Sequence, residues 1–120
     1  MNRKILLIED NEQNIYLETF ILEKHGYEVF QARTGPEGIA LVKRIDPDMI
    51  LLDIQLPEMD GYMVASELRK LLVKKVIPII AITSFAMPGD REKALAAGCT
   101  DHITKPIDPD TFIPSIEKYF

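Results

Sequence analysis

Side chains that could perform chemistry follow four apolar runs of this sequence, at the point where each run ends. They are acids, hydroxyls and one cation: Glu9 and Asp10 after KILLI, Asp53 after MILL, Thr83 and Ser84 after IPIIAI, and Lys105 after DHIT. Three carboxylates that converge without a cation repel one another and raise their own pKa values. Oxygen ligands with no histidine or cysteine nearby suit Mg²⁺ or Mn²⁺ rather than zinc. These residues therefore predict an acidic site for a hard divalent cation.

Strand-like and helix-like segments alternate along the chain and have to position these side chains. We expect strands at residues 4–8, 28–32, 49–53, 77–83 and 101–104, each followed by a helix. Such alternation with short connections predicts parallel strands and right-handed crossovers, hence a doubly wound α/β sandwich. Ligands of an open parallel sheet bind beyond the carboxyl ends of its strands. The acids, the hydroxyls and the lysine are thus expected at one edge of the sheet.

The helices carry their own signals in the sequence. The first is predicted from about Asn11 to His25, and its inward face is expected to consist of Leu17, Phe20 and Ile21, with Lys24 at the edge. Side chains that can cap the later helices at their first turn are Thr34 with Glu37, Asp60, and Asp108 followed by Pro109.

Length and composition indicate one ordinary globular domain. The chain has 120 residues, 47% of them hydrophobic and 28% charged, and it shows no repeat, linker or separate output module. It lacks a signal peptide and a membrane-length apolar run, so we expect a cytoplasmic protein that does not enter a membrane. The net charge of −5 argues against direct nucleic-acid binding. The single cysteine, Cys99, excludes an internal disulfide and is expected to be buried.

Four motifs together resemble one known family, the receiver domain of bacterial two-component response regulators. They are LLIEDN, LLDIQLPEMDG, IAITSFA and ITKPI, which match that family in order and spacing over essentially the whole chain. Within the family, the sequence is most similar to stand-alone regulators of the DivK kind and to the receivers of hybrid kinases. The resemblance implies a flavodoxin-like sheet of five parallel strands in the order 2-1-3-4-5 with five helices, and a receiver domain over residues 1–120 with no output domain.

The resemblance also implies a role for each residue of the predicted edge. Asp53 would accept the phosphoryl group, Thr83 would donate a hydrogen bond to it, and Lys105 would pair with its oxygens. Mg²⁺ or Mn²⁺ would be held by Asp10 directly, by Glu9 through water, by Asp53, and by the backbone carbonyl group of Gln55. The bond between Lys105 and Pro106 resembles the family's cis peptide, although most X-Pro bonds are trans.

The implied function is a phosphoacceptor signalling switch that catalyses only its own phosphorylation and dephosphorylation. Its partners would be a histidine kinase or histidine phosphotransfer protein and a downstream protein bound at the face of the fourth helix, fifth strand and fifth helix, with the chain itself a monomer or weak dimer. The chain departs from the family pattern at His102, where Tyr or Phe is usual, and at Ser84, where Ala is common. With Thr83, these two residues are the expected switch.

Two other functions are compatible with an acid after a buried strand. A small phosphatase of the haloacid-dehalogenase type also forms an aspartyl phosphate. Such phosphatases have a DxD pattern, however, and in this sequence Gln55 stands at the position of the second acid. The chain is also too short for the cap of that enzyme. A receiver-like interaction module that never carries phosphate usually lacks the acceptor or the acids, and both are present in this sequence.

Overall fold

The computed structural model describes residues 2–56, 59–73, 76–84 and 88–120. Strands and helices alternate five times, and all strand pairs are parallel. The strands are β1 (Lys4–Ile8), β2 (Glu28–Ala32), β3 (Met49–Asp53), β4 (Ile79–Thr83) and β5 (Asp101–Thr104). The helices are α1 (Glu12–Lys24), α2 (Gly35–Ile45), α3 (Gly61–Leu71), α4 (Asp90–Ala96) and α5 (Pro109–Glu117). The strand order β2-β1-β3-β4-β5 confirms the predicted doubly wound, flavodoxin-like fold.

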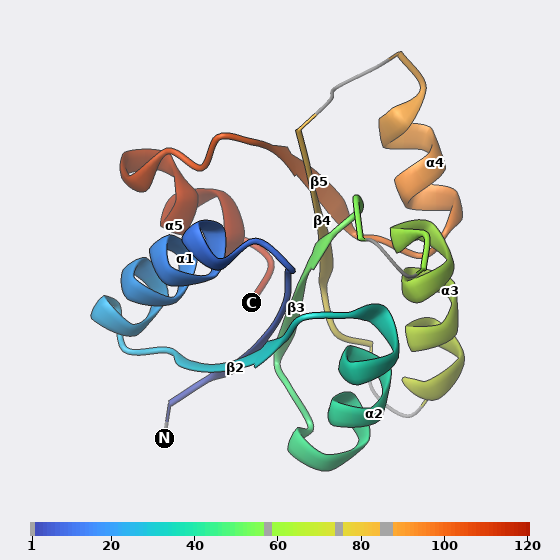
Figure 1. The fold of residues 1–120 in the computed structure, drawn as a ribbon, viewed down its shortest axis with the longest axis horizontal. Helices are drawn as coiled ribbons and strands as arrows, with labels where there is room; N and C mark the ends of the chain where they lie inside the picture. Colours follow the sequence, from blue (N-terminus) through green and yellow to red (C-terminus); the bar gives the residue numbers. More distant parts are fainter. Residues whose placement is uncertain (1, 57–58, 74–75, 85–87) are drawn as a thin grey trace.

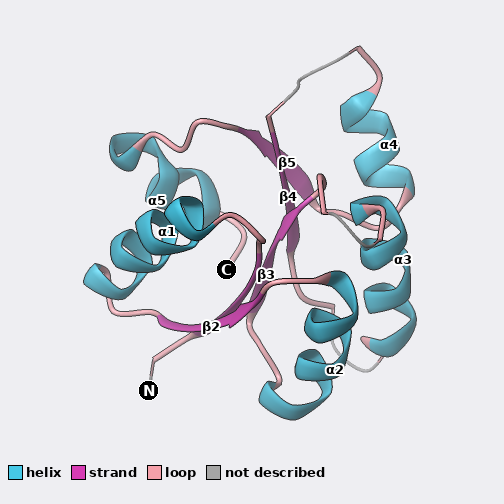
Figure 2. Cartoon of the chain, in the orientation of Figure 1, coloured by secondary structure: helices cyan, strands magenta, loops and turns pink. Residues whose placement is uncertain are grey.

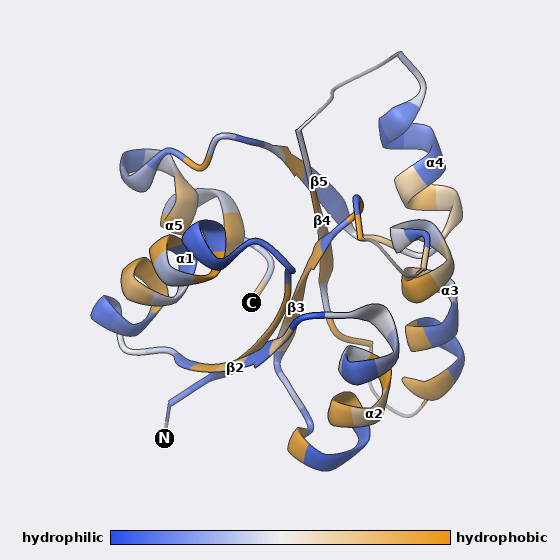
Figure 3. Ribbon diagram, in the orientation of Figure 1, coloured by the Kyte–Doolittle hydropathy of each residue, from blue (hydrophilic) through white to orange (hydrophobic). Residues whose placement is uncertain are grey.

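The sheet lies between two layers of helices, as Figures 1 and 2 show. Helices α1 and α5 cover one face, and α2, α3 and α4 cover the other (Figure 1). Because both faces are covered, the three central strands are almost wholly apolar and buried. Figure 3 shows the same division, with hydrophobic strands at the centre and hydrophilic turns on the outside of the helices.

Alternate residues of each central strand point into different layers. In β1, Leu6 and Ile8 belong to the core under α2, α3 and α4, whereas Ile5 and Leu7 belong to the core under α1 and α5. Strands β3 and β4 divide in the same way, as expected for side chains that alternate across a pleated strand. Cys99 is buried in the first of these cores, as predicted.

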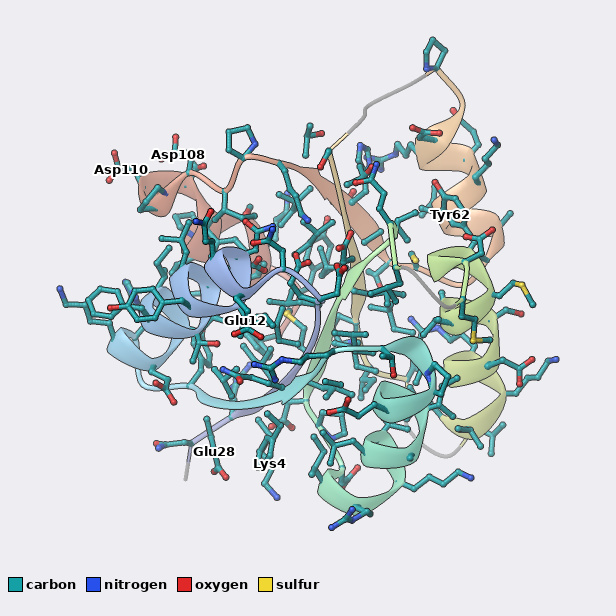
Figure 4. All side chains as sticks on the ribbon, in the orientation of Figure 1. Lys4, Glu12, Glu28, Tyr62, Asp108 and Asp110 are labelled. Atoms are coloured by element: carbon teal, nitrogen blue, oxygen red, sulfur yellow. The ribbon has the colours of Figure 1, made fainter. Side chains whose placement is uncertain are left out.

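The helices begin at the capping residues that the sequence predicts. Thr34 accepts a hydrogen bond from the Glu37 amide at 3.1 Å, and Asp60 accepts one from the Tyr62 amide at 2.9 Å. Asp108 caps α5 through the Asp110 amide, also at 2.9 Å, and both acids lie at the outer end of that helix (Figure 4). These bonds satisfy amides that have no partner inside the helix, so they define where each helix starts.

The predicted inward face of α1 is wrong in part. Phe20 is 52% exposed and Lys24 is also exposed, while Ile21 is buried and Leu17 is half-buried. The residues of α1 that the structure buries are Ile15, Glu18, Ile21 and Leu22. The helix is therefore rotated relative to the expected face, and a glutamate occupies the middle of the buried stripe.

None of the helices within the described residues is long and apolar enough to cross a membrane.

Candidate functional site

Three acids meet at the carboxyl edge of the sheet, as predicted. Glu9 and Asp10 follow β1, and Asp53 ends the neighbouring strand β3. Each can offer one carboxylate oxygen, and these oxygens all lie within 4.8 Å of one another. Glu9 and Asp53 are only 1% and 3% exposed, whereas Asp10 is open to solvent. The cluster therefore consists of two buried acids and one acid that is exposed to solvent.

Backbone amides hold the two buried acids in place. The Gln55 amide donates to Asp53 Oδ1 at 2.9 Å, and the Asn11 amide donates to Glu9 Oε2 at 3.2 Å. The loop after β3 is closed by the Gly61 amide, which donates to the Ile54 carbonyl group at 3.1 Å. A Cβ atom on Gly61 would lie 2.4 Å from Ile54 Cα, so only glycine allows this approach. The loop that carries Gln55 is thereby held beside Asp53.

Lys105 brings a positive charge to the acids from the segment after β5. Its Nζ atom lies 2.9 Å from Glu9 Oε1 and 3.4 Å from Asp53 Oδ2, and its side chain is 13% exposed. The Lys105 amide donates to the Thr83 carbonyl group at 2.7 Å, which joins this segment to the end of β4. The peptide bond between Lys105 and Pro106 is cis.

The charges of this cluster are not balanced by the lysine alone. Burial, together with the neighbouring Asp53, raises the pKa of Glu9 to about 7 even though Lys105 acts in the opposite direction. Burial would lower the pKa of Lys105, but Glu9 and Asp53 overcome it, so the lysine pKa is raised. Burial is the main cause of this rise, and the second carboxylate adds to it, so Lys105 alone does not keep Glu9 ionised. The all-oxygen donor set fits Mg²⁺ or Mn²⁺, which would supply the missing positive charge.

Thr83 and Ser84 lie beside the acids at the end of β4. Thr83 is 7% exposed and pairs in register with Thr104 of β5, while Ser84 is exposed. The Ser84 amide donates to Gln55 Oε1 at 3.2 Å. The side chain of Gln55 thus connects the loop after β3 with the loop after β4. The backbone amide of Gln55 donates a hydrogen bond to Asp53.

His102 lies in β5, which β4 separates from the strand of Asp53. Its side chain is 22% exposed, and its Nδ1 atom has no hydrogen-bond partner among the described residues. Its amide donates to Asp101 Oδ1 at 2.8 Å, and the same carboxylate pairs with Arg91 of α4 at 3.2 Å and accepts a hydrogen bond from the Tyr119 hydroxyl. His102 therefore adjoins a polar network that joins α4, β5 and the segment after α5.

Sequence reasoning missed one acid near the site. Glu18 is 0% exposed, and both of its carboxyl oxygens lack a hydrogen-bond partner within the described part of the chain. Burial, together with the charges of Glu9 and Asp53, raises its pKa to about 8, and Lys105 acts in the opposite direction. The spacing of Ile15, Glu18, Ile21 and Leu22 along one helix face was the available signal.

Comparisons with known proteins point to a single family. The family model for the response regulator receiver domain matches residues 5–117. The polar-differentiation response regulator DivK of Brucella ovis is 41% identical over 119 residues, which cover 99% of this chain and 97% of that protein.

Solved structures agree with this match. The receiver domain of the sensor histidine kinase PA1611 from Pseudomonas aeruginosa, solved with a magnesium ion coordinated in its active-site cleft, is 34% identical with a TM-score of 0.89, over 99% of this chain and 98% of that one. The chemotaxis protein CheY4 of Vibrio cholerae is 26% identical with a TM-score of 0.95, over 100% of both chains.

Proposed function

The chain belongs to the response regulator receiver domain family, and from this premise we propose that Asp53 is the residue that takes the phosphoryl group. Proteins of this family are phosphoacceptor signalling switches of two-component systems, and this chain is one of them. The observation that carries the assignment is the position of Asp53, which is buried at the end of β3 between the acids Glu9 and Asp10 and the ammonium group of Lys105. Because the chain belongs to this family, the alternative of a haloacid-dehalogenase-type phosphatase is dropped.

Asp53 is positioned for in-line attack on the phosphorus atom, because its two carboxylate oxygens have different partners. The Gln55 amide holds Oδ1, and Lys105 lies 3.4 Å from Oδ2. A carboxylate oxygen forms a bond to phosphorus while the bond from phosphorus to the donor's nitrogen or oxygen breaks, and the donor keeps that electron pair. The product is an acyl phosphate on Asp53. Lys105 then faces the charge on the phosphoryl oxygens, so positioning and neutralisation provide most of the catalysis.

The same proposal assigns the metal ligands. Receiver domains of this family bind Mg²⁺, as the PA1611 receiver does. In this chain Asp10 and Asp53 would hold Mg²⁺ or Mn²⁺ directly, Glu9 would act through water, and Gln55 would contribute its carbonyl oxygen. When bound, the cation supplies positive charge to the phosphoryl oxygens. The support is an all-oxygen cluster within 4.8 Å and the raised pKa of Glu9.

Phosphorylation would be transmitted from Thr83 and Ser84 toward the face formed by α4, β5 and α5. The family implies interaction with histidine kinases or phosphotransfer proteins and with downstream proteins. We propose that the downstream protein contacts this face, with the chain cytoplasmic, a monomer or weak dimer, and not bound to nucleic acid or membrane. The network of Arg91, Asp101 and Tyr119 supports this surface because it joins α4, β5 and the segment directly after α5.

Intact-mass measurement after treatment with acetyl phosphate and Mg²⁺ tests the assignment of Asp53. We expect one phosphoryl adduct that is labile to hydroxylamine, absent in Asp53→Asn and absent in excess chelator. Asp46→Asn is the matched control, because Asp46 is exposed and has a left-handed φ of 50° that asparagine also accepts. The same adduct on Asp53→Asn, or full labelling in chelator, would contradict the proposal.

His102→Tyr tests the proposed switch separately from the chemistry. The imidazole is smaller than a phenol and can form hydrogen bonds with the hydroxyl groups of Thr83 or Ser84. The variant is expected to accept a phosphoryl group on Asp53 as the wild type does, but to show different amide shifts in α4 and β5 on addition of a phosphoryl mimic. Identical shifts in both proteins would show that His102 has no role in the switch.

A further inference from the structure

Glu18 is a buried acid that the proposed chemistry does not use. It lies in the middle of α1, in the stripe that α1 buries, and it is fully withdrawn from solvent. Neither carboxyl oxygen has a hydrogen-bond partner within the described residues. A buried polar group without a partner costs free energy, and an apolar side chain in this place would avoid that cost. A structural role in the core therefore does not account for a glutamate at this position.

The charged groups that shift the pKa of Glu18 all belong to the proposed phosphorylation site. Glu9 acts from the end of β1, Asp53 from the end of β3, and Lys105 from the segment after β5. The neighbours of Glu18 on the same face of α1, one turn away on each side, are uncharged, namely Asn14, Ile15, Ile21 and Leu22. The residues that α5 buries in this layer are apolar as well, namely Phe112, Ile113 and Ile116. Glu18 is thus coupled electrostatically to the acids and the lysine, although it makes no hydrogen bond to them.

We propose that Glu18 is a positioning residue of the metal site: its carboxyl group holds a proton while the acids lack a divalent cation and gives up that proton when the cation binds. This inference rests on the metal site proposed above. Lys105 is paired with Glu9 at 2.9 Å. Once Glu9 takes part in binding the cation, ionised Glu18 becomes a counter-charge for Lys105 and keeps the lysine near Asp53.

The coupling has a measurable consequence, because a proton lost from Glu18 leaves the protein whenever metal binds. Titration calorimetry of Mg²⁺ in two buffers of different ionisation enthalpy counts the protons released. At about pH 7.5, we expect the wild type to release roughly half a proton more per metal than Glu18→Gln. Between about pH 6.5 and pH 8.5, its Mg²⁺ affinity should rise about 6-fold more than that of the variant. Glu9 releases protons in both proteins, so the difference measures the proton of Glu18 together with its coupling to Glu9.

Two further variants make this experiment decisive. Glu18→Leu, which places an apolar side chain in the buried stripe, should fold and show the same reduced proton release as Glu18→Gln, so it replaces the glutamine variant if that one does not fold. Glu23→Gln removes an exposed acid from the same helix and should behave as the wild type.

The possible failures can be told apart. Equal proton release and equal pH dependence in the wild type and both Glu18 variants would overturn this inference alone. A loss in Glu23→Gln as large as in Glu18→Gln would also overturn it, because the effect would then come from the overall charge of the helix. A wild-type protein that binds no Mg²⁺ would overturn both this inference and the proposed metal site.

Discussion

Lys105 and Arg69 are two partly buried cations that meet very different partners. Lys105 faces the carboxylates of Glu9 and Asp53 at 2.9 and 3.4 Å. Both partners are acids that can take up a proton, and in the proposed function they would also bind a metal ion or accept a phosphoryl group. The interactions of Lys105 therefore depend on the state of the site.

Arg69, on α3, is held by groups that carry no charge. It donates to the carbonyl oxygens of Gly98 and Ile77, both at 2.7 Å, and to the hydroxyl group of Thr100 at 3.3 Å. These oxygens belong to the segments before β4 and β5, so the guanidinium group joins three parts of the fold. None of them titrates in the physiological range, and the arginine is thus bound in the same way whatever happens at Asp53.

The pKa values of the two cations are shifted in opposite directions, in agreement with this difference. Burial lowers the pKa of Arg69, because neutral oxygens only partly replace water. Burial opposes the charge of Lys105 as well, but the two acids raise its pKa above the usual value. A cation among neutral acceptors stabilises the fold, whereas a cation among excess carboxylates can respond to a ligand. Five variants test this distinction.

Arg69→Ala is expected to have the largest effect, a loss of about 3 kcal/mol in the free energy of unfolding. Two backbone carbonyl groups lose a charged donor, and α3 loses its link to the segments before β4 and β5. Urea denaturation with and without Mg²⁺ measures the loss, which Mg²⁺ should not restore beyond the stabilisation that it gives the wild type. Lys70→Ala on the exposed side of the same helix is the control and should cost less than about 0.5 kcal/mol. Equal losses in the two variants would remove Arg69 from its structural role.

Asp10→Ala is expected to weaken Mg²⁺ binding about 100-fold, because it removes a proposed ligand. Lys105→Ala should not weaken it and is expected to tighten it several-fold, since a positive charge next to the acids is lost. Calorimetric titration of both variants at one pH gives the contrast. Similar losses of affinity in the two proteins would show that Lys105 supports the metal site rather than competing with it.

Glu18→Gln is expected to change the dependence of stability on pH. The raised pKa values of Glu9 and Glu18, about 7 and about 8, mean that the folded chain keeps protons which the unfolded chain releases above about pH 4.5. Metal-free wild type should therefore lose stability as pH rises from about 4.5 to about 8.

Removal of the Glu18 contribution makes this slope shallower. Near pH 6.5 the variant should be about 2 kcal/mol more stable than the wild type, and near pH 4.5 the two should be alike. Thermal unfolding across this range provides the measurement, with Glu23→Gln as the control. Parallel curves for wild type and Glu18→Gln would contradict the prediction.

Arg69→Lys is expected to have the smallest effect, a loss of about 1 kcal/mol. The charge is kept, but one ammonium group cannot reach the three separate acceptors that the planar guanidinium group contacts. Urea denaturation beside Arg69→Ala shows how much of the stabilisation comes from geometry. A variant as stable as the wild type would mean that charge alone accounts for the role of Arg69.

Much of the fold and most of the site could be predicted from local features of the sequence. Apolar runs alternating with helical segments imply parallel strands, and parallel strands bring their carboxyl ends to one edge. That geometry alone places Glu9, Asp10, Asp53 and Lys105 together. The helix caps at Thr34, Asp60 and Asp108 depend only on neighbouring residues, so they were also predictable.

The sequence by itself therefore determined the order of the elements and the acids at the sheet edge, because both follow from short-range patterns. Only the tertiary structure decided which face of α1 is buried. Apolar residues lie on both sides of that helix, and its packing in the α1–α5 layer leaves Phe20 exposed and encloses Glu18. Tertiary structure likewise decided the partners of Arg69, since its acceptors are backbone oxygens whose positions depend on how distant segments pack.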